Sequence, residues 1–476
     1  MQLFAKIEDL KKSYEGVLTL SNDLTQVTVL NPNLIRDPLI NSLVYNATFN
    51  SNADIVAACR WLVRATAQAL GIFPSSIQPV YEAMAAGKLT GFTTPAINVR
   101  GFTYDFVAAV LRAAKKKTAF PVIFELAKSE MGYTQQTPAE YATAVIAAAI
   151  KENYQGPLYI QGDHFQISAA KYTKDSTPQV EEIKKLVSQA IEAGFYNIDI
   201  DTSTLVDLSK STLTEQQRTN FELGALFTEY IRKTEPKDVT ISIGGEIGEV
   251  GHKNSTVEEL VAYMDGFHGC LKGKNMKGPS KVSVQTGTSH GGIPLADGTV
   301  AKVKLDFDTL RELSKVARER YGMSGAVQHG ASTLPDELFH KFPEVKASEI
   351  HLATGFQNLI LDHPQFPMSL KQEIYAHLRE KCKEEWSAGQ TEEQFYYKTR
   401  KKSFGPFKKQ MWDLDANLKK AIFTTLQEKF EFLFDQLSVS GKRQEVLNFA
   451  KIDKVNKKAP PFLQIESPNE AKRKAS

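Results

Sequence analysis

The stretch GPLYIQGDH, residues 156–164, is an apolar run that ends in polar and charged side chains. Seven more stretches share this design: TTPAINV (93–99), FPVIFELA (120–127), YNIDID (196–201), VTISIGGE (239–246), KVSVQTG (281–287), SGAVQHG (324–330) and EIHLATG (349–355). Most of the eight are continuously apolar rather than alternating, as is typical of strands buried on both faces of a parallel sheet. They therefore predict eight parallel strands between about residues 90 and 355.

Amphipathic segments separate these strands. In YDFVAAVLRAAKKK (104–117) and VEEIKKLVSQAIEAG (180–194) apolar residues recur at three- and four-residue intervals, the spacing that gives a helix one buried stripe. Eight strand–helix units in about 265 residues match the size of a (β/α)₈ TIM barrel, and a doubly wound open sheet is the alternative. The barrel is favoured because polar and ionisable residues cluster at the C-terminal ends of many strands, and in a barrel those ends converge.

Helical extensions are expected on both sides of the barrel. We expect an N-terminal extension over residues 1–80, the barrel over 81–365, a C-terminal extension over 366–455 and a flexible tail over 456–476. Helical patterns occur in ADIVAACRWLVRATAQALG (53–71), KQEIYAHLREKCKEEW (371–386) and LKKAIFTTLQEKFEFLFDQL (418–437). The tail is rich in Pro, Lys and Ser, a composition that is poor in residues able to form a core.

The composition excludes several classes of protein. Hydrophobic residues make up 42% and charged residues 24% of the 476 residues, which are ordinary globular values. A net charge of only +3 argues against a dedicated nucleic-acid binder. The three cysteines, Cys59, Cys270 and Cys382, form no CxxC pair, which argues against a disulfide framework. No signal-peptide pattern and no stretch of roughly 18 apolar residues is found, so we expect a cytoplasmic protein that does not engage a membrane.

Three of the nine histidines, His164, His290 and His329, lie at the ends of predicted strands. A single histidine at a strand end is more often structural or in contact with substrate. Neutral imidazoles that converge from three strands suit zinc with an open fourth position, the arrangement of a catalytic zinc site. We therefore predict that these histidines bind zinc, or another divalent metal, at the mouth of the barrel.

Carboxylates accompany the histidines. Asp163 directly precedes His164, where it could cap the following helix or act as a proton shuttle beside the metal. Asp201 and Glu246 also end strands, and buried carboxylates need partners. They could orient the metal-binding histidines or bind the metal themselves. Asp199 has no assigned role and could simply cap a loop.

Glycine-containing turns follow two of the histidines, in HGGIP (290–294) and HGAST (329–333). Small residues there let backbone N–H groups approach a phosphate, and Ser332 adds a hydroxyl. TIM barrels often bind phosphate in the loops after the seventh and eighth strands, which correspond to HGAST and to ATGFQ (353–357). These turns predict an anion site next to the metal.

Residues from about 90 to 365 resemble the class II, metal-dependent fructose-bisphosphate and tagatose-bisphosphate aldolases. The resemblance is carried by AINVRGFTYDFVAAVLRAA (96–114), GDHF (162–165), GFYNIDIDTST (194–204), GGEIGEVG (244–251), TGTSHGG (286–292) and VQHGAST (327–333). The order and the spacing of these motifs match the family. The resemblance implies that His164, His290 and His329 are the zinc ligands and that Asp163 is the acid/base at the substrate hydroxyl.

The resemblance also implies a substrate and a reaction. Asn98 ends the first strand as in the family, and Gly291, Ser332 and Thr354 fall where the family binds the phosphate next to the ketone. The implied reaction is the reversible aldol cleavage of a phosphorylated ketose similar to fructose 1,6-bisphosphate, in which zinc stabilises the enediolate. A homo-oligomer and a monovalent cation are expected from the resemblance alone.

The eighth strand and the fifth loop depart from the family. Where the family has Asn-x-Asp-Thr-Asp, this chain has His351-Leu-Ala-Thr-Gly, so only the threonine remains. The family's loop glutamate aligns near Asn254, which leaves Glu249 as the nearest second acid/base and His252 as another. A lysine that often follows the sixth-strand His-Gly is absent from the matching place.

These departures keep two other functions open. One is a zinc-dependent epimerase or aldolase that acts on an unphosphorylated keto-sugar acid, with His351 in contact with the carboxylate. The other is a non-catalytic, aldolase-like subunit that binds a partner enzyme. The first of these functions uses the same metal site and aldol base as the aldolase of a phosphorylated ketose. The two enzymatic hypotheses therefore differ mainly in the substrate.

Overall fold

The computed structural model describes residues 1–248, 253–287, 295 and 305–463. Eight parallel strands form a closed barrel: β4 (Thr94–Asn98), β5 (Ile123–Ala127), β6 (Gly156–Gln166), β7 (Asn197–Asp201), β8 (Ser242–Gly248), β9 (Lys281–Val284), β10 (Ala326–Gln328) and β11 (Glu349–Leu352). Neighbours follow the order β6-β5-β4-β11-β10-β9-β8-β7, and β7 pairs back onto β6. This closure confirms the (β/α)₈ barrel and excludes the doubly wound open sheet. Each strand coincides with one of the eight predicted stretches, although β6 and β8 continue two residues beyond the predicted ends.

A ninth strand, β3 (Ile72–Ser75), lies outside the barrel and was not predicted. It runs parallel to the first part of β6, where Ile72 pairs with Gly156 and Ser75 with Tyr159. The second part of β6, from Gln161 to Gln166, pairs with β7 instead. Because β6 is long, its first part pairs with β3 of the N-terminal segment and its second part pairs with β7 to close the barrel.

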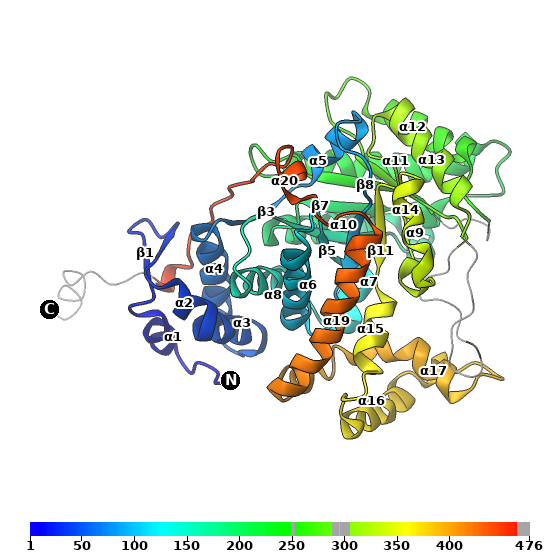
Figure 1. The fold of residues 1–476 in the computed structure, drawn as a ribbon. Coiled ribbons are helices and arrows are strands. Elements are labelled where there is room, and N and C mark those ends of the chain that lie inside the picture. The colour runs from blue at the N-terminus through cyan, green and yellow to red at the C-terminus, as the bar shows by residue number, and fades with distance from the viewer. Residues whose placement is uncertain (249–252, 288–294, 296–304, 464–476) are drawn as a thin grey trace.

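Helices surround the barrel as the three- and four-residue periodicity predicts (Figure 1). They are α6 (Thr103–Lys117), α7 (Lys128–Thr134), α8 (Pro138–Lys151), α9 (Ala169–Lys174), α10 (Ser176–Ala193), α11 (Leu213–Thr234), α12 (Val257–Leu271), α13 (Phe307–Tyr321), α14 (Lys341–Glu344) and α15 (Thr354–Leu361). α10 shows how such a helix is delimited. The Asp175 side chain accepts a hydrogen bond from the Thr177 N–H at 3.1 Å, and Gly194 ends the helix at φ 104°, a conformation that favours glycine.

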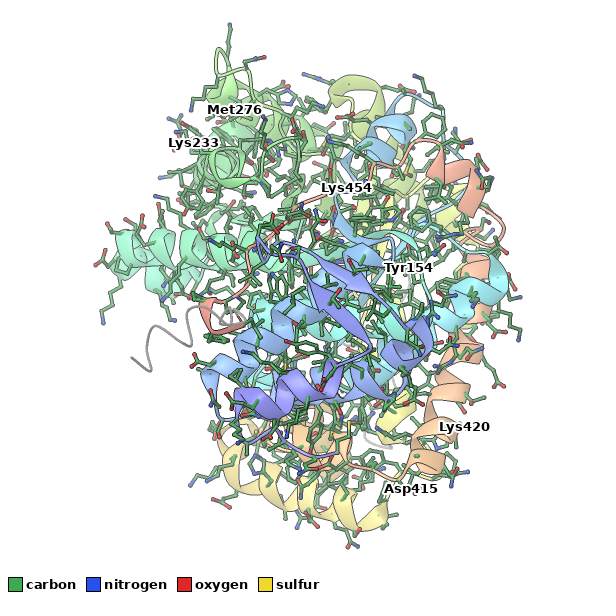
Figure 2. The ribbon with its side chains drawn as sticks, turned by 90° about the vertical axis from the view of Figure 1, so that its left-hand side faces the viewer. Tyr154, Lys233, Met276, Asp415, Lys420 and Lys454 are labelled. Atoms are coloured by element: carbon green, nitrogen blue, oxygen red, sulfur yellow. The ribbon has the colours of Figure 1, made fainter. Side chains whose placement is uncertain are left out.

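The N-terminal segment contains α1 (Ile7–Tyr14), a hairpin of β1 (Leu18–Leu20) and β2 (Val27–Val29), α2 (Pro32–Leu34), α3 (Ile40–Phe49), α4 (Ala53–Ala69) and α5 (Gln78–Ala85). Figure 2 looks onto the hairpin and the helices α1 to α4, which lie in front of the barrel in that view. The hairpin was not predicted. Residues that follow the last helix, α20 (Arg443–Leu447), return to this segment, where Trp61 donates a hydrogen bond to the carbonyl of Lys457 at 2.8 Å. Residues 464–476 of the expected tail lie outside the described residues.

The C-terminal segment contains α16 (Met368–Lys381), α17 (Glu392–Thr399), the 3₁₀ helix η6 (Arg400–Ser403), α18 (Lys408–Trp412), α19 (Ala416–Gln436) and α20 (Arg443–Leu447). Trp412 joins three parts of the chain. Its ring stacks on Tyr104 of α6 at 5.8 Å and meets Phe49 of α3 edge-on at 5.4 Å. Aromatic contacts of this kind contribute beyond the area that they bury. In the described part of the chain, no helix is both long and apolar enough to cross a membrane.

Candidate metal and active site

A bulge in β6 turns two neighbouring side chains towards the mouth of the barrel. The pairing of β6 with β7 shifts register between Gly162 and Phe165, and His164 has φ 40°, in the left-handed region. On a regular strand Asp163 and His164 would point to opposite faces. A Cβ on Gly162 would collide with the ring of Phe165, so glycine is required for this turn. The bulge explains how two consecutive residues can serve one site.

His164 and His329 face each other across the mouth of the barrel. The Nε2 atom of His164 lies 2.8 Å from the Nδ1 atom of His329. Their outer nitrogens are held from behind, because His164 Nδ1 lies 3.0 Å from Asp201 and His329 Nε2 lies 2.7 Å from the Ser283 hydroxyl. Outer partners of this kind fix the ring orientation of metal-binding histidines, so that the inner nitrogens present their lone pairs.

Glu246 lies behind both histidines. Its Oε2 atom is 3.7 Å from His164 Nδ1 and 3.7 Å from His329 Nε2. Burial raises the pKa of Glu246 to about 8, and the nearby charge of Asp201 acts in the same direction. Burial would also raise the pKa of Asp201, but the charge of His164 and the hydrogen bonds to His164, Ser203 and Gln166 together lower it. Asp201 and Glu246 therefore both lie where the sequence places them, next to the histidines.

The donor set fits a divalent cation. The ligand atoms of Asp163, His164 and His329 lie within 4.8 Å of one another, and so do those of His164, Asp201 and Glu246. Two imidazoles and carboxylates are the ligands that zinc takes in catalytic sites. Of the other predicted site residues, His290, Gly291 and Glu249 lie outside the described residues, as does His252. The structure therefore describes two of the three predicted metal-binding histidines, His164 and His329.

Asp163 is held in place by an amide and an imidazole. The Asn98 side chain donates a hydrogen bond to Asp163 Oδ2 at 2.8 Å, and His351 Nδ1 lies 3.3 Å from Asp163 Oδ1. Burial would raise the pKa of Asp163, but the charges of His164 and His351 outweigh it and hold that pKa well below its usual range. Asp163 is thus a carboxylate at neutral pH. Asn98 contacts this carboxylate, and it also lines the pocket.

A cavity of about 580 Å³ lies at the mouth of the barrel and is lined by Asn98, Asp163, His164, His329 and His351. The predicted phosphate-binding residues Ser332 and Thr354 also line it. The two loops that carry them meet, because the Gly355 N–H donates a hydrogen bond to the Ser332 hydroxyl at 3.1 Å. Arg100, which was not singled out from the sequence, donates a hydrogen bond to the Thr354 hydroxyl at 3.1 Å. The cavity therefore combines a metal-binding end with hydroxyl groups and a guanidinium.

A layer of buried charges lies inside the barrel, towards the N-terminal ends of the strands. The Lys281 ammonium contacts Glu349 and lies 3.0 Å from Asp199 Oδ2, and the side chains of Lys281 and Glu349 are 1% and 0% exposed. Glu349 in turn lies 2.6 Å from His351 Nε2. Asp199, to which the sequence assigns no role beyond a possible loop cap, is therefore an ion-pair partner within the barrel. TIM-barrel interiors are dominated by Val, Ile and Leu, so this layer is unusual.

Replacing Lys281 with Met is expected to lower the free energy of unfolding by about 3 kcal/mol, because it leaves two buried carboxylates without their cation. Burial raises the pKa of Asp199 to about 6 even in the presence of Lys281. Because protonation relieves an unpaired carboxylate, the loss is expected to grow from acidic to mildly alkaline pH. Urea unfolding of the variant and the wild type at several pH values measures this loss of stability.

Lys277→Met is the matched control, since Lys277 pairs with Glu82 on the surface with both side chains about half exposed. Exposed ion pairs contribute about 0–1 kcal/mol, so this variant should unfold like the wild type. If Lys281→Met were no less stable than Lys277→Met at any pH, the ion pairs of Lys281 would not contribute to the stability of the barrel.

Comparison with known proteins relates the chain to a family. The family model described as fructose-bisphosphate aldolase class-II matches residues 78–424. This range includes the whole barrel and much of the C-terminal segment. No curated protein matches the sequence.

Solved structures share the fold at low identity. A fructuronate-tagaturonate epimerase from Cohnella laeviribosi is 14% identical, with 86% of this chain and 90% of that chain covered and a TM-score of 0.50. A probable tagatose 6-phosphate kinase from Sinorhizobium meliloti is 16% identical, with 75% and 99% covered and a TM-score of 0.50. A fructose-bisphosphate aldolase from Campylobacter jejuni is 16% identical, with 78% and 97% covered and a TM-score of 0.47. For the epimerase and the kinase, the likeness at these identities shows the fold alone.

Proposed function

The chain belongs to the class-II fructose-bisphosphate aldolase family, and from that premise we propose that it is a metal-dependent aldolase that reversibly cleaves a phosphorylated ketose. The observation that carries the proposal is the placement of Asp163 beside the facing nitrogens of His164 and His329. A carboxylate next to a candidate metal site can take a proton from a substrate hydroxyl.

The metal site of the proposal consists of His164 and His329, with His290 as the third ligand by resemblance. Zinc, when bound there, would supply a fixed positive charge that polarises the ketone. Asp201 and Ser283 hold the two rings in the ligating orientation through their contacts with the outer nitrogens. Glu246 lies 3.7 Å from the outer nitrogen of each ring, and a cation bound between the rings would favour its ionised form.

The proton chemistry is assigned to Asp163. In the cleavage direction, Asp163 accepts the proton of the hydroxyl on the carbon that becomes the aldehyde. The electrons of the broken carbon–carbon bond remain on the ketone fragment, and a second acid then protonates that carbon. Asn98 keeps the carboxylate of Asp163 in position by its hydrogen bond at 2.8 Å. Glu249 is the candidate for the second acid, by its place in the fifth loop.

The substrate phosphate is assigned to the loops after β10 and β11. Ser332 and Thr354 line the cavity beside the candidate metal ligands, and Arg100 contacts Thr354. Hydroxyl groups, glycine-rich backbone and a guanidinium are groups that bind phosphate in proteins. This arrangement supports a phosphate next to the ketone.

The experiment that tests the substrate is a cleavage assay with zinc-reconstituted protein and fructose 1,6-bisphosphate, coupled to the oxidation or reduction of the triose phosphates. We expect triose phosphate to form, and removal of zinc by a chelator to abolish it. If fructose 1,6-bisphosphate gives no triose phosphate with zinc restored, the proposal fails for that substrate.

A second candidate is an epimerase or aldolase of an unphosphorylated keto-sugar acid. His351 and Ala353 favour it, since they replace the Asn and Asp of the family on the eighth strand and line the same cavity. A protein of the same fold from Cohnella laeviribosi is named as a fructuronate-tagaturonate epimerase. Conversion of fructuronate in the absence of fructose 1,6-bisphosphate cleavage would favour this candidate.

A further inference from the structure

One lysine of the C-terminal segment lines the cavity of the candidate active site. Lys401 belongs to η6, which follows α17 far from the barrel strands in the sequence. It lines the same cavity as Asn98, Asp163, His164 and Thr354. The barrel motifs account for the other side chains named there, whereas Lys401 comes from outside them.

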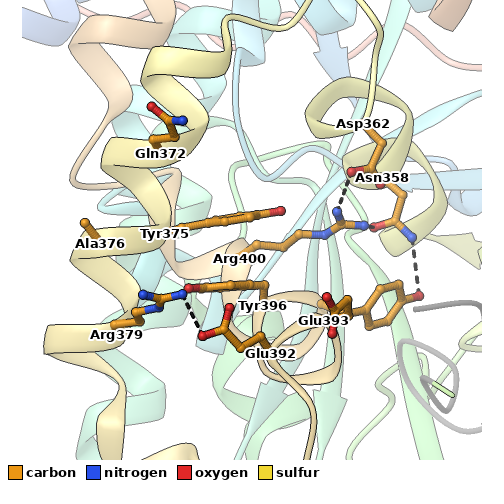
Figure 3. A pocket seen from close by; sticks show the side chains of 11 residues that line it. Asn358, Asp362, Gln372, Tyr375, Ala376, Arg379, Glu392, Glu393, Tyr396 and Arg400 are labelled. Carbon is orange, nitrogen blue, oxygen red and sulfur yellow. Dashed lines mark hydrogen bonds and ion pairs between the residues drawn. The ribbon is translucent and has the colours of Figure 1, made fainter. Parts of the chain in front are cut away.

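The cations around Lys401 are already paired. Arg400 Nη1 lies 2.8 Å from Asp362, and Figure 3 shows its guanidinium reaching towards Asp362 and Asn358. Lys402 pairs with Glu385, and Lys408 lies 2.6 Å from Glu140. These ion pairs attach the segment to α15 and α8, so its course over the barrel is fixed by residues other than Lys401.

Two glycines bring the segment into close contact with the barrel. A Cβ on Gly101, in the loop after β4, would collide with the ring of Phe404. A Cβ on Gly405 would lie 2.5 Å from the carbonyl oxygen of Tyr133 in α7. Since real side chains do not approach this closely, both positions require glycine. Lys401 is therefore held at the rim of the cavity by tight packing on either side.

Lys401 itself has no anionic partner among the residues that the structure describes. Its side chain is half-buried, and its ammonium lies 5.6 Å from the centre of the Tyr133 ring. Burial lowers the pKa of Lys401, and the neighbouring charge of Arg100 lowers it further. A cation that is removed from water without a partner is unfavourable, so its placement indicates a ligand that supplies the negative charge.

The other cations of the cavity do not meet this description. Arg100 Nε lies 2.6 Å from Glu130, and Lys128 lies 2.8 Å from Glu182, so their charges are compensated within the protein. Lys171 lines the cavity but is exposed to solvent. Lys401 is thus the half-buried cation of this cavity that forms no ion pair with a described carboxylate, and the charges of Glu130 and Glu385 act on it only from a distance.

We propose that Lys401 binds an oxyanion of the substrate, a phosphate or a carboxylate, at the rim of the cavity near Arg100 and Thr354. This inference rests on the proposed function, because it assumes a sugar substrate in this cavity. It assigns a role in substrate binding to the C-terminal segment. It also supplies a cation to a chain that lacks the lysine expected soon after His290-Gly291.

Isothermal titration calorimetry tests this role without turnover when all the zinc-reconstituted proteins also carry Asp163→Asn, which is expected to keep the metal and block cleavage; the protein that retains Lys401 is then the wild-type reference. The ligands are fructose 1,6-bisphosphate, fructuronate and uncharged fructose. We expect Lys401→Met to weaken binding of at least one anionic ligand on the order of 10- to 100-fold, the size of a charged hydrogen bond, and to leave fructose unchanged. A loss confined to the bisphosphate identifies a phosphate, and a loss confined to fructuronate identifies a carboxylate.

Two further variants serve as controls. Lys398→Met removes an exposed charge from the same segment and is expected to bind all ligands like the wild type. Lys401→Arg keeps the charge and should retain affinity within a few-fold of the wild type. The proposal is overturned if Lys401→Met binds both anions like the wild type, or if the wild type binds neither anion more tightly than fructose. If the binding pattern holds but neither anion is converted, the proposed function fails and the role of Lys401 stands.

Discussion

The His329→Ala variant is expected to lose the bound metal and to fall in activity on the order of 10³-fold or more, because metal polarisation contributes several kcal/mol to such reactions. His329 Nδ1 faces His164 Nε2 at 2.8 Å, so the substitution removes one of two converging donors. Elemental analysis of the dialysed protein measures metal content, and the cleavage assay measures turnover on the same sample.

A second histidine controls for the loss of an imidazole as such. The His340 side chain is 45% exposed and lies 3.6 Å from Glu344, and it does not line the cavity. His340→Ala should keep both metal and turnover. If His329→Ala kept its metal and its activity, the metal site would have to be abandoned, and the hypothesis of a non-catalytic aldolase-like subunit would gain support.

The Asp163→Asn variant is expected to keep its metal and its fold but to lose turnover by about 10²- to 10⁴-fold, the range for a general acid/base. The amide preserves the shape of the carboxylate and can still accept the hydrogen bond from Asn98, which now measures 2.8 Å to Asp163. It cannot accept the substrate proton. Steady-state kinetics with metal analysis therefore separate proton transfer from metal binding.

Asp207→Asn is the matched control for this substitution. Asp207 is about half exposed and its side chain accepts a hydrogen bond from the Ser209 N–H at 3.0 Å in a surface turn. It should have the turnover of the wild type. Retained turnover in Asp163→Asn would contradict the role of Asp163, whereas loss of metal in that variant would make Asp163 a ligand instead of a base.

The barrel could be predicted because its strands are buried on both faces. Continuous apolar runs, as in FPVIFELA and at the start of GPLYIQGDH, mark such strands directly, and polar ends such as that of GPLYIQGDH mark the mouth. The hairpin of β1 and β2 was missed, since each of its strands has only three residues and carries little pattern. β3 was missed for the same reason, as its four residues lie between two helices.

The candidate site could be predicted in part. Strand ends located His164, His329, Asp201 and Glu246, but the bulge that turns Asp163 into the site depends on the packing of Phe165 over Gly162. That packing leaves no signature in hydropathy.

The buried charges of Lys281 and Glu349 did leave a signature. Both are ionisable residues at the start of otherwise apolar strands, in KVSV and EIHL. Lys401 left none, because its position depends on how a distant segment packs against Gly101 and Tyr133. Contacts between segments so far apart in the chain cannot be read from local periodicity.

Anomalous diffraction at the zinc absorption edge, from crystals of the zinc-reconstituted protein, tests the central claim most directly. We expect one strong peak at the mouth of the barrel, about 2.0–2.1 Å from one ring nitrogen of His164 and one of His329. Asp163 should lie beside the ion. A zinc peak elsewhere would contradict the account. The absence of a peak from crystals grown with stoichiometric zinc would also contradict it.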